Sequence, residues 1–333
     1  MHRDGPGLLL RDLRRGEDAQ IEAIGKVIQE VAPEVLVLSG FDYDHDLIAL
    51  QAFADLLADH NVPYPYLFAR RPNTGRPTGA DVDGDGLLGG PRDAHGYGNF
   101  GGQGGMAILS KFPISQDLAK DHSALIWSEL DLPYGPPEGT PDVLRLSTTA
   151  HWDVPLVLPS GQVLHLMTWH ATPPVFDGPE DRNGRRNHDE TYFWLDQIAT
   201  VDAPFVVLGD ANADPMDGDG RPDAIRRLLN HSRIQDPAPL STGAPVDAIA
   251  DGGVNADHRS NPAYDTVDWS DDPGGPGNLR VSYVLPSIDF RIIDTGVFWP
   301  APSDPLRALI GADGNLASRH RLVWVDLVLD RAP

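Results

Sequence analysis

The feature that most constrains the fold is a set of short apolar runs, several of which end on a charged or polar residue. The runs cover residues 35–38, 106–109, 163–169, 205–208, 281–285 and 322–329. Apolar runs of this length, bounded by turn residues, are typical of strands that are buried on both faces. Strands of this kind that alternate with helices predict a layered α/β protein with its sheets inside.

Segments with helical spacing separate some of these runs. Residues 18–31 place isoleucine or valine at every third or fourth position, with Asp18 as the predicted N-cap and Pro33 beyond the end. Residues 46–59 and 188–199 also have a helical pattern. We expect these helices to cover the outer faces of the sheets.

Size and composition are those of one globular domain. The chain has 333 residues, of which 41% are hydrophobic, so we expect a single domain over residues 1–333. No stretch approaches the ~20 apolar residues of a membrane span, and the first residues do not have a signal-peptide pattern. The chain has no cysteine, which excludes disulfides, zinc–thiolate sites and a cysteine nucleophile. The sequence does not predict an oligomeric state.

The charge balance bears on the class of ligand. The net charge is −23, so the surface repels a phosphate backbone, and duplex nucleic acid is disfavoured as a partner. A bound divalent cation can reverse the sign of the charge locally. Among phosphate-bearing ligands, the charge favours a small-molecule or lipid-derived phosphoester over duplex DNA.

Polar residues lie at the ends of three apolar runs. His170, Asp210 and His320 each lie at or beside such an end, and ligands collect at strand ends in layered α/β proteins. We therefore expect these three residues to share one site. Asn212 follows Asp210 by two residues, so a carboxylate and a carboxamide can face one pocket and hold a metal, a water or a phosphate. The alternative is a tight turn, because Gly, Asp and Asn favour turns.

The segment 208–214 (LGDANAD) is similar to the GDxN signature of the endonuclease/exonuclease/phosphatase family. Four more segments resemble motifs of this family in the same order: 103–114 (QGGMAILSKFPI), 169–173 (WHATP), 280–284 (RVSYV) and 318–320 (SRH). The resemblance extends from about residue 20 to the end of the chain.

This resemblance implies a four-layer α/β sandwich, with two mixed β-sheets packed face to face and helices outside. It also implies hydrolysis of a phosphate mono- or diester with a divalent cation, Mg²⁺, Mn²⁺ or Ca²⁺. By resemblance, His320 is the central catalytic histidine and His170 contacts the phosphate. Asp210 orients the attacking water, Asn212 holds phosphate or metal, and both are candidate metal ligands.

Four further residues are candidates for contacts with the substrate: Gln103, Arg182, Asn187 and Arg319. Arg182 and Asn187 belong to the polar segment 181–187, whose arginines stand out in an acidic chain and suit a phosphate. A solvated loop is the alternative for this segment.

Some positions depart from the family pattern. Gly40 stands where the family has its metal-binding Glu, and Asp42 and Asp44 are candidates to replace it as metal ligands. Ser282 and Arg319 stand where two carboxylates are expected, and the opening strand of the family would lie before the first residue. An arginine in place of an acid weakens a cation site unless it contacts the phosphate itself. The alternative function is therefore a catalytically degenerate member that binds a ligand or partner.

The segment 81–86 (DVDGDG) has a different chemistry. Aspartates at its positions 1, 3 and 5 match the start of a calcium loop, so Asp81, Asp83 and Asp85 are candidate ligands of a structural Ca²⁺. Arg92 stands where an EF-hand has its last ligand, and an acidic solvated loop is the alternative. A third hypothesis is a calcium-stabilised extracellular protein. The loop, the acidic surface and the absence of cysteine favour a secreted or periplasmic location.

Overall fold

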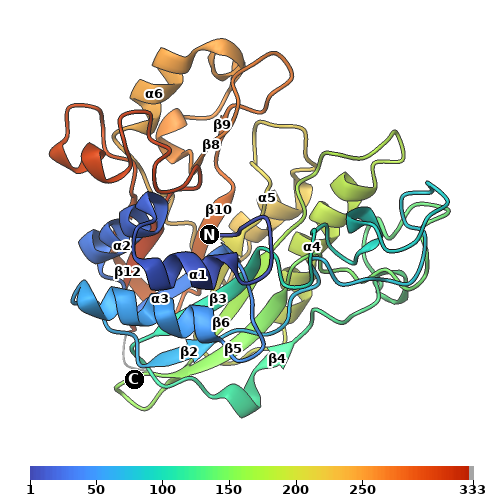
Figure 1. The fold of residues 1–333 in the computed structure, drawn as a ribbon, viewed down its shortest axis with the longest axis horizontal. Coiled ribbons are helices and arrows are strands. Elements are labelled where there is room, and N and C mark those ends of the chain that lie inside the picture. The colour runs from blue at the N-terminus through green and yellow to red at the C-terminus, as the bar shows by residue number, and fades with distance from the viewer. Residues whose placement is uncertain (330–333) are drawn as a thin grey trace.

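The structure is a computed structural model that describes residues 1–329. Two β-sheets pack face to face, and helices cover both outer faces (Figure 1). The predicted four-layer α/β sandwich is therefore confirmed. Within the described residues, no helix combines the length and the hydropathy that are needed to cross a bilayer.

The first sheet contains three antiparallel strands in the order β1-β3-β2. They are β1 (Val35–Phe41), β3 (Gly105–Ser110) and β2 (Tyr66–Phe68). Its outer face packs against α1 (Leu8–Arg15), α2 (Ala19–Val31) and α3 (Ile48–Asp59), which lie together in Figure 1. Asp18 caps α2 as predicted, because its side chain accepts a hydrogen bond from the Ile21 amide at 2.9 Å.

The second sheet contains five strands in the order β10-β7-β6-β5-β4, of which only β6 and β7 are parallel. The strands are β10 (Ser282–Pro286), β7 (Phe205–Asp210), β6 (Val163–His170), β5 (His151–Val157) and β4 (Lys120–Asp121). Its outer face packs against α4 (Arg182–Ile198) and α5 (Asp223–Leu229). This sheet is mixed, as the resemblance implied, whereas the first sheet is antiparallel.

Apolar side chains from both sheets fill the space between them. Trp152 and Val154 from β5 and Leu166 from β6 meet Ile108 from β3, and Phe68 from β2 packs edge-on against Trp152 at a centroid distance of 5.2 Å. Full burial of one large apolar side chain stabilises the fold by about 1.5–3 kcal/mol. The interface between the sheets is thus a main source of stability.

The last third of the chain adds smaller elements. The strands β11 (Phe290–Val297) and β12 (Val323–Leu329) form an antiparallel pair, and β8 (Val267–Asp268) and β9 (Asn278–Leu279) form a short antiparallel ribbon. The helix α6 (Ala244–Asp251) precedes this ribbon. Short 3-10 helices cover Pro91–Asp93, Gln116–Leu118, Trp127–Glu129, Gly253–Asp257, Pro262–Tyr264 and Pro305–Leu309.

The predicted elements are present, with shifted ends. Each of the six apolar runs lies in or largely within a strand, and the predicted helix 188–199 begins earlier, at Arg182. The sequence did not predict α1, β5 or β11. In β5, Asp153 and Pro155 interrupt the apolar run, although Trp152, Val154 and Leu156 alternate toward the core.

Candidate active site

Three neighbouring strands of the second sheet place His170, Asp210 and Ser282 in one row. His170, at the end of β6, pairs with Asp210 at the end of β7, and Asp210 pairs with Ser282 at the start of β10. Alternate residues of a strand face the same side. Because Leu166 and Val206 pack between the sheets, His170 and Asp210, at the ends of their strands, point to the same side as these two residues.

The backbone at this edge is held tightly. A Cβ atom at Gly209 would lie 2.0 Å from the Trp169 carbonyl oxygen, so only glycine lets β7 approach β6 this closely. Beyond the strands, the Ala171 amide donates to the Asp210 carbonyl at 2.9 Å, and the Ala211 amide donates to the Val281 carbonyl at 2.8 Å. These bonds fix the position from which the Asp210 side chain extends.

His320 reaches this row from the segment before β12. It forms an isolated bridge with Val267 of β8, and its Nδ1 atom lies 3.2 Å from Asp210 Oδ2. His170 Nε2 lies 3.8 Å from the same oxygen. Trp269 packs edge-on against the His320 ring, with centroids 5.5 Å apart. One carboxylate oxygen therefore faces two imidazoles from distant parts of the chain, as the sequence predicted.

The surroundings of the two histidines differ. The His320 side chain is 37% exposed. Burial lowers the pKa of His170, and the neighbouring His320 and His2 lower it further, while Asp210 raises it. His170 is therefore a neutral imidazole at neutral pH. His2 was not predicted as a neighbour of the site, and no sequence signal distinguishes it.

Asn212 forms the turn that follows the strand. Its backbone is left-handed (φ 47°), its amide donates to Asp210 Oδ1 at 3.0 Å, and its side chain donates to the Ala171 carbonyl at 2.8 Å. The tight turn considered from sequence is thus present. It holds one oxygen of Asp210 and leaves the other to the histidines.

Gly40 lies in a bulge of β1 with φ 72°, and the segment Met1–Arg3 passes beside it. Asp42 accepts hydrogen bonds from the amides of Arg3 and Gly104, both at 2.8 Å. Burial raises the pKa of the Asp42 carboxyl, while these two bonds and His2 oppose the rise. Asp44 accepts from the first amides of α3, Ile48 and Ala49, each at 2.8 Å.

The carboxylates at the centre are few for a hard divalent cation, which prefers several oxygen ligands. A cation site needs several ligand atoms close together. Among residues 1–329, Asp210, Asp42 and Asp44 do not belong to any group of three acidic or histidine residues whose ligand atoms all lie within 4.8 Å of one another. Asp42 and Asp44 bind backbone amides instead. In this arrangement the side chains do not form a complete cation site.

The four candidate substrate residues lie in different surroundings. Gln103 bonds to the backbone of Arg3 and Asn99, and Asn187 is fully buried and donates to the carbonyls of Thr172 and Ala211 at 2.7 Å each. Asn187 thus ties the loop after His170 to the loop after Asp210. Arg319 is exposed on the segment that carries His320. Arg182 donates to the Val82 carbonyl at 2.7 Å and lines a separate cavity.

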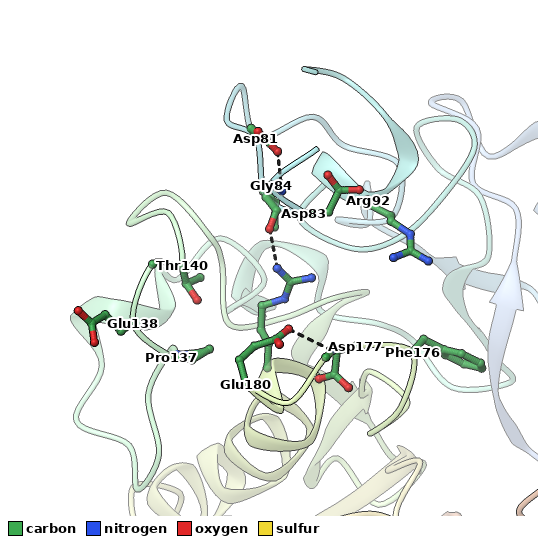
Figure 2. Close-up of a pocket in the computed structure, with 14 residues that line it drawn as sticks. Asp81, Asp83, Gly84, Arg92, Pro137, Glu138, Thr140, Phe176, Asp177 and Glu180 are labelled. Carbon is green, nitrogen blue, oxygen red and sulfur yellow. Dashed lines mark hydrogen bonds between the residues drawn. The ribbon is translucent and has the colours of Figure 1, made fainter. Parts of the chain in front are cut away.

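This cavity has a volume of about 750 Å³ and lies between the loops around residues 81–84, 137–140 and 176–182 (Figure 2). The candidate calcium loop forms one wall, and Arg92 also lines it. Asp81, Asp83 and Asp85 bring their carboxylates within 4.8 Å of one another. Asp81 bonds to the amides of Gly84 and Gly86, so the loop is closed by its own hydrogen bonds. The calcium assignment stays a prediction.

A buried acid behind the site was not predicted. Glu190 of α4 is fully buried and accepts hydrogen bonds from the amides of Thr148 and Thr172, both at 2.7 Å. Burial raises its pKa to about 7, while the charge of Arg186 and these hydrogen bonds lower it. Thr172 follows His170 by two residues, so Glu190 helps to hold the loop that follows the histidine.

Comparison with known proteins gives a family match over most of the chain. The model of the Endonuclease/Exonuclease/phosphatase family matches residues 10–320. A search of curated proteins gave no match.

Solved structures share the fold at low identity. An endonuclease/exonuclease/phosphatase from Beutenbergia cavernae DSM 12333 matches with a TM-score of 0.57 and 18% identity, over 93% of this chain and 66% of that one. This chain thus spans just under two thirds of that protein. A family protein from Leptotrichia buccalis C-1013-b matches with a TM-score of 0.51 and 14% identity, over 93% and 92% of the two chains. The human nocturnin catalytic domain matches with a TM-score of 0.50 and 14% identity, over 93% and 87%.

Proposed function

Because the chain belongs to the endonuclease/exonuclease/phosphatase family, we propose that it hydrolyses phosphate esters where His170, Asp210 and His320 meet. The observation that carries the proposal is the position of Asp210 Oδ2, 3.2 Å from His320 and 3.8 Å from His170. The three groups come from two strand ends and one remote segment, and they converge at one edge of the five-stranded sheet.

The roles of the side chains follow from their surroundings. Asp210 holds the N–H at His320 Nδ1, so Nε2 is free to take a proton from a water molecule. The water oxygen bonds to phosphorus, the ester P–O bond breaks, and the proton passes from His320 to the leaving oxygen. Neutral His170 donates its single N–H to a phosphoryl oxygen. A general base of this kind contributes a rate factor of about 10²–10⁴.

The charge of the chain supports a small substrate. With a net charge of −23, the surface repels the extended phosphate array of duplex DNA, whereas a small phosphate mono- or diester presents little charge to repel. Arg319, on the segment that carries His320, is the candidate phosphate contact, and Gln103 and Asn187 are the candidate supports of the substrate-binding loops, whereas Arg182 lines the separate cavity.

A divalent cation remains part of the proposal. Enzymes of the family generally use such ions. In this chain Asp210 and Asn212 are the proposed ligands, with Asp42 and Asp44 as further candidates, and Mg²⁺, Mn²⁺ and Ca²⁺ are the candidate ions. When bound, the ion would neutralise charge on the phosphoryl group.

The second candidate is a degenerate member that binds a ligand without turnover. Gly40, Ser282 and Arg319 stand where the family pattern has acids, and the incomplete set of oxygen ligands around Asp210 favours this alternative. The two candidates differ in one measurable property, which is turnover.

The test measures hydrolysis of bis-p-nitrophenyl phosphate and p-nitrophenyl phosphate by metal-stripped protein, with Mg²⁺, Mn²⁺ or Ca²⁺ added back. We expect a divalent-dependent rate that Asp210→Ala lowers by about 10²-fold or more. Asp59→Ala is the matched control, because Asp59 is exposed at the end of α3 and is not a candidate site residue. No turnover with any ion from folded protein would favour the degenerate binding protein.

A further inference from the structure

Three carboxylates converge where α6 meets the β8–β9 ribbon, outside the active site. Asp251 ends α6, Asp268 ends β8 and Asp271 lies in the loop that follows. One carboxylate oxygen of each lies within 4.8 Å of the other two. Arg321 offsets part of the charge, because its Nη2 atom lies 3.0 Å from Asp268 Oδ2. Charges of one sign at this spacing repel one another unless a cation lies among them.

A buried carboxamide without partners lies beside this cluster. Asn278 is fully buried, and neither its Oδ1 nor its Nδ2 atom has a hydrogen-bond partner. It pairs directly with Asp268 across the ribbon, and directly paired residues of antiparallel strands have their side chains on the same face. A buried amide oxygen requires a donor or a cation. Its position next to Asp268 is an observation independent of the acids themselves.

The surrounding loop fixes these groups in place. Asn255 donates to Asp271 Oδ1 at 2.6 Å and accepts from the Asn278 amide at 2.8 Å. A Cβ atom at Gly277 would lie 2.4 Å from Asn255 Oδ1, so this close approach requires glycine. The oxygen atoms are therefore held before any ligand binds.

We propose that Asp251, Asp268, Asp271 and the Asn278 carboxamide oxygen bind a hard divalent cation, Ca²⁺ first. Ca²⁺ takes carboxylate and amide oxygens together with water, in flexible geometry. Exposed Asp251 leaves room for water ligands. Nitrogen and sulfur ligands, which softer metals prefer, do not belong to the cluster.

The site would act on the active site through β8. The Asp268 amide donates to the Arg319 carbonyl at 3.1 Å, and the Arg321 amide donates to the Thr266 carbonyl at 2.8 Å. These two bonds flank His320, so a cation on Asp268 stabilises the segment that presents this histidine. The cation site itself does not depend on the proposed hydrolysis.

The test follows Tb³⁺ luminescence excited through tryptophan in the metal-free full chain. Trp269, next to Asp268, is the expected energy donor. We expect emission that Ca²⁺ displaces, and a rise in melting temperature on addition of Ca²⁺. Asp251→Asn combined with Asp271→Asn should weaken Ca²⁺ binding by more than about tenfold. Asp55→Asn combined with Asp59→Asn is the matched control, because both side chains are exposed on α3 and belong to neither acidic cluster. Asp83→Asn combined with Asp85→Asn is a comparison variant, which changes the other candidate calcium cluster in the same way.

The outcomes separate the two clusters. Loss of a Ca²⁺ site in the 251/271 variant but not in the 55/59 control supports the proposal, whether or not the 83/85 variant loses another site. Weaker emission in Trp269→Phe at unchanged Ca²⁺ affinity by calorimetry also supports it. Wild-type protein that neither binds Tb³⁺ nor melts higher with Ca²⁺ overturns it, as does retention of all binding in the 251/271 variant. If the double variant does not fold, exposed Asp251→Asn alone decides the question by the same measurement.

Discussion

Two rows of side chains cross the five-stranded sheet, and each has an aspartate at its centre. The active-site row contains His170, Asp210 and Ser282 on β6, β7 and β10. The outer row contains His165, Asp153 and Lys120 on β6, β5 and β4. In the outer row His165 Nδ1 lies 2.6 Å from Asp153, whereas in the active-site row His170 Nε2 lies 3.8 Å from Asp210.

The difference lies in how many partners the strands themselves supply. Asp153 contacts Lys120, its direct register partner on β4, and His165, which lies diagonally across from it on β6, so its own sheet supplies both partners. The register partners of Asp210 are Ser282 and His170, and the His170 ring is 3.8 Å from its carboxylate. One carboxylate oxygen therefore stays available to His320, which comes from a remote segment. A row completed by its own sheet stabilises the fold, and an incomplete row at a strand end leaves a group for chemistry.

The largest effect should come from exchanging the histidine of each row. His320→Gln removes the proposed base and should lower kcat on bis-p-nitrophenyl phosphate by about 10²–10⁴-fold with little change in melting temperature. His165→Gln should leave kcat within a factor of about three and lower the melting temperature, because it breaks a partly buried pair. Steady-state kinetics and thermal unfolding of both variants test this. Equal losses of activity would mean that the two rows do not differ in function.

A smaller effect should come from Glu190, which supports the active-site row from behind. Its folded pKa of about 7 lies above the unfolded value of 4.5, so between these pH values the unfolded chain loses a proton that the folded chain keeps. This contribution to stability is therefore fully present below pH 4.5 and is lost as the pH rises through 7, by roughly 3 kcal/mol. Glu190→Gln should remove this dependence.

The measurement is the free energy of urea unfolding at pH 4.5 and pH 8, compared between wild type and Glu190→Gln. The variant should lose about 1 kcal/mol at low pH, because its amide nitrogen cannot accept from the Thr172 amide. It should then change less with pH than the wild type. A parallel pH dependence in both proteins would show that Glu190 does not titrate in this range.

The sequence predicted the parts of the site that have local signals. Asp210 and Asn212 follow an apolar run in a recognisable motif, His170 ends another run, and Asp18 precedes an amphipathic helix. These signals depend on residues close together in the chain. The alternation of runs and helices also predicted a layered α/β protein. The four-layer sandwich itself was implied by the family resemblance.

The burial of polar side chains in α4 was not predicted, because it depends on distant contacts. Arg186, Asn187 and Glu190 give α4 a polar sequence that is typical of a solvated face, yet loops that include Leu146, Thr148 and Thr172 bury this face. The pairing of Asn278 with Asp268 depends equally on a register that the sequence does not indicate. Buried polar groups satisfied by remote backbone are therefore the features that only the structure shows.

The smallest effect should come from Lys120, which completes the outer row at its exposed end. Its side chain is 58% exposed and its Nζ atom lies 3.5 Å from Asp153, so Lys120→Ala should cost less than about 1 kcal/mol, and less still at high salt. Lys26→Ala is the matched control, because Lys26 pairs with exposed Glu22 at 3.1 Å.

Asp153 is 4% exposed, so once His165 is also replaced, the carboxylate is left buried with neither partner. The loss in unfolding free energy for Lys120→Ala with His165→Gln should therefore exceed the sum of the two single losses, as a double-mutant cycle in urea can measure. Simple additivity would mean that Asp153 keeps its stabilisation from elsewhere, and the outer row would then not be a closed unit that contrasts with the open one at Asp210.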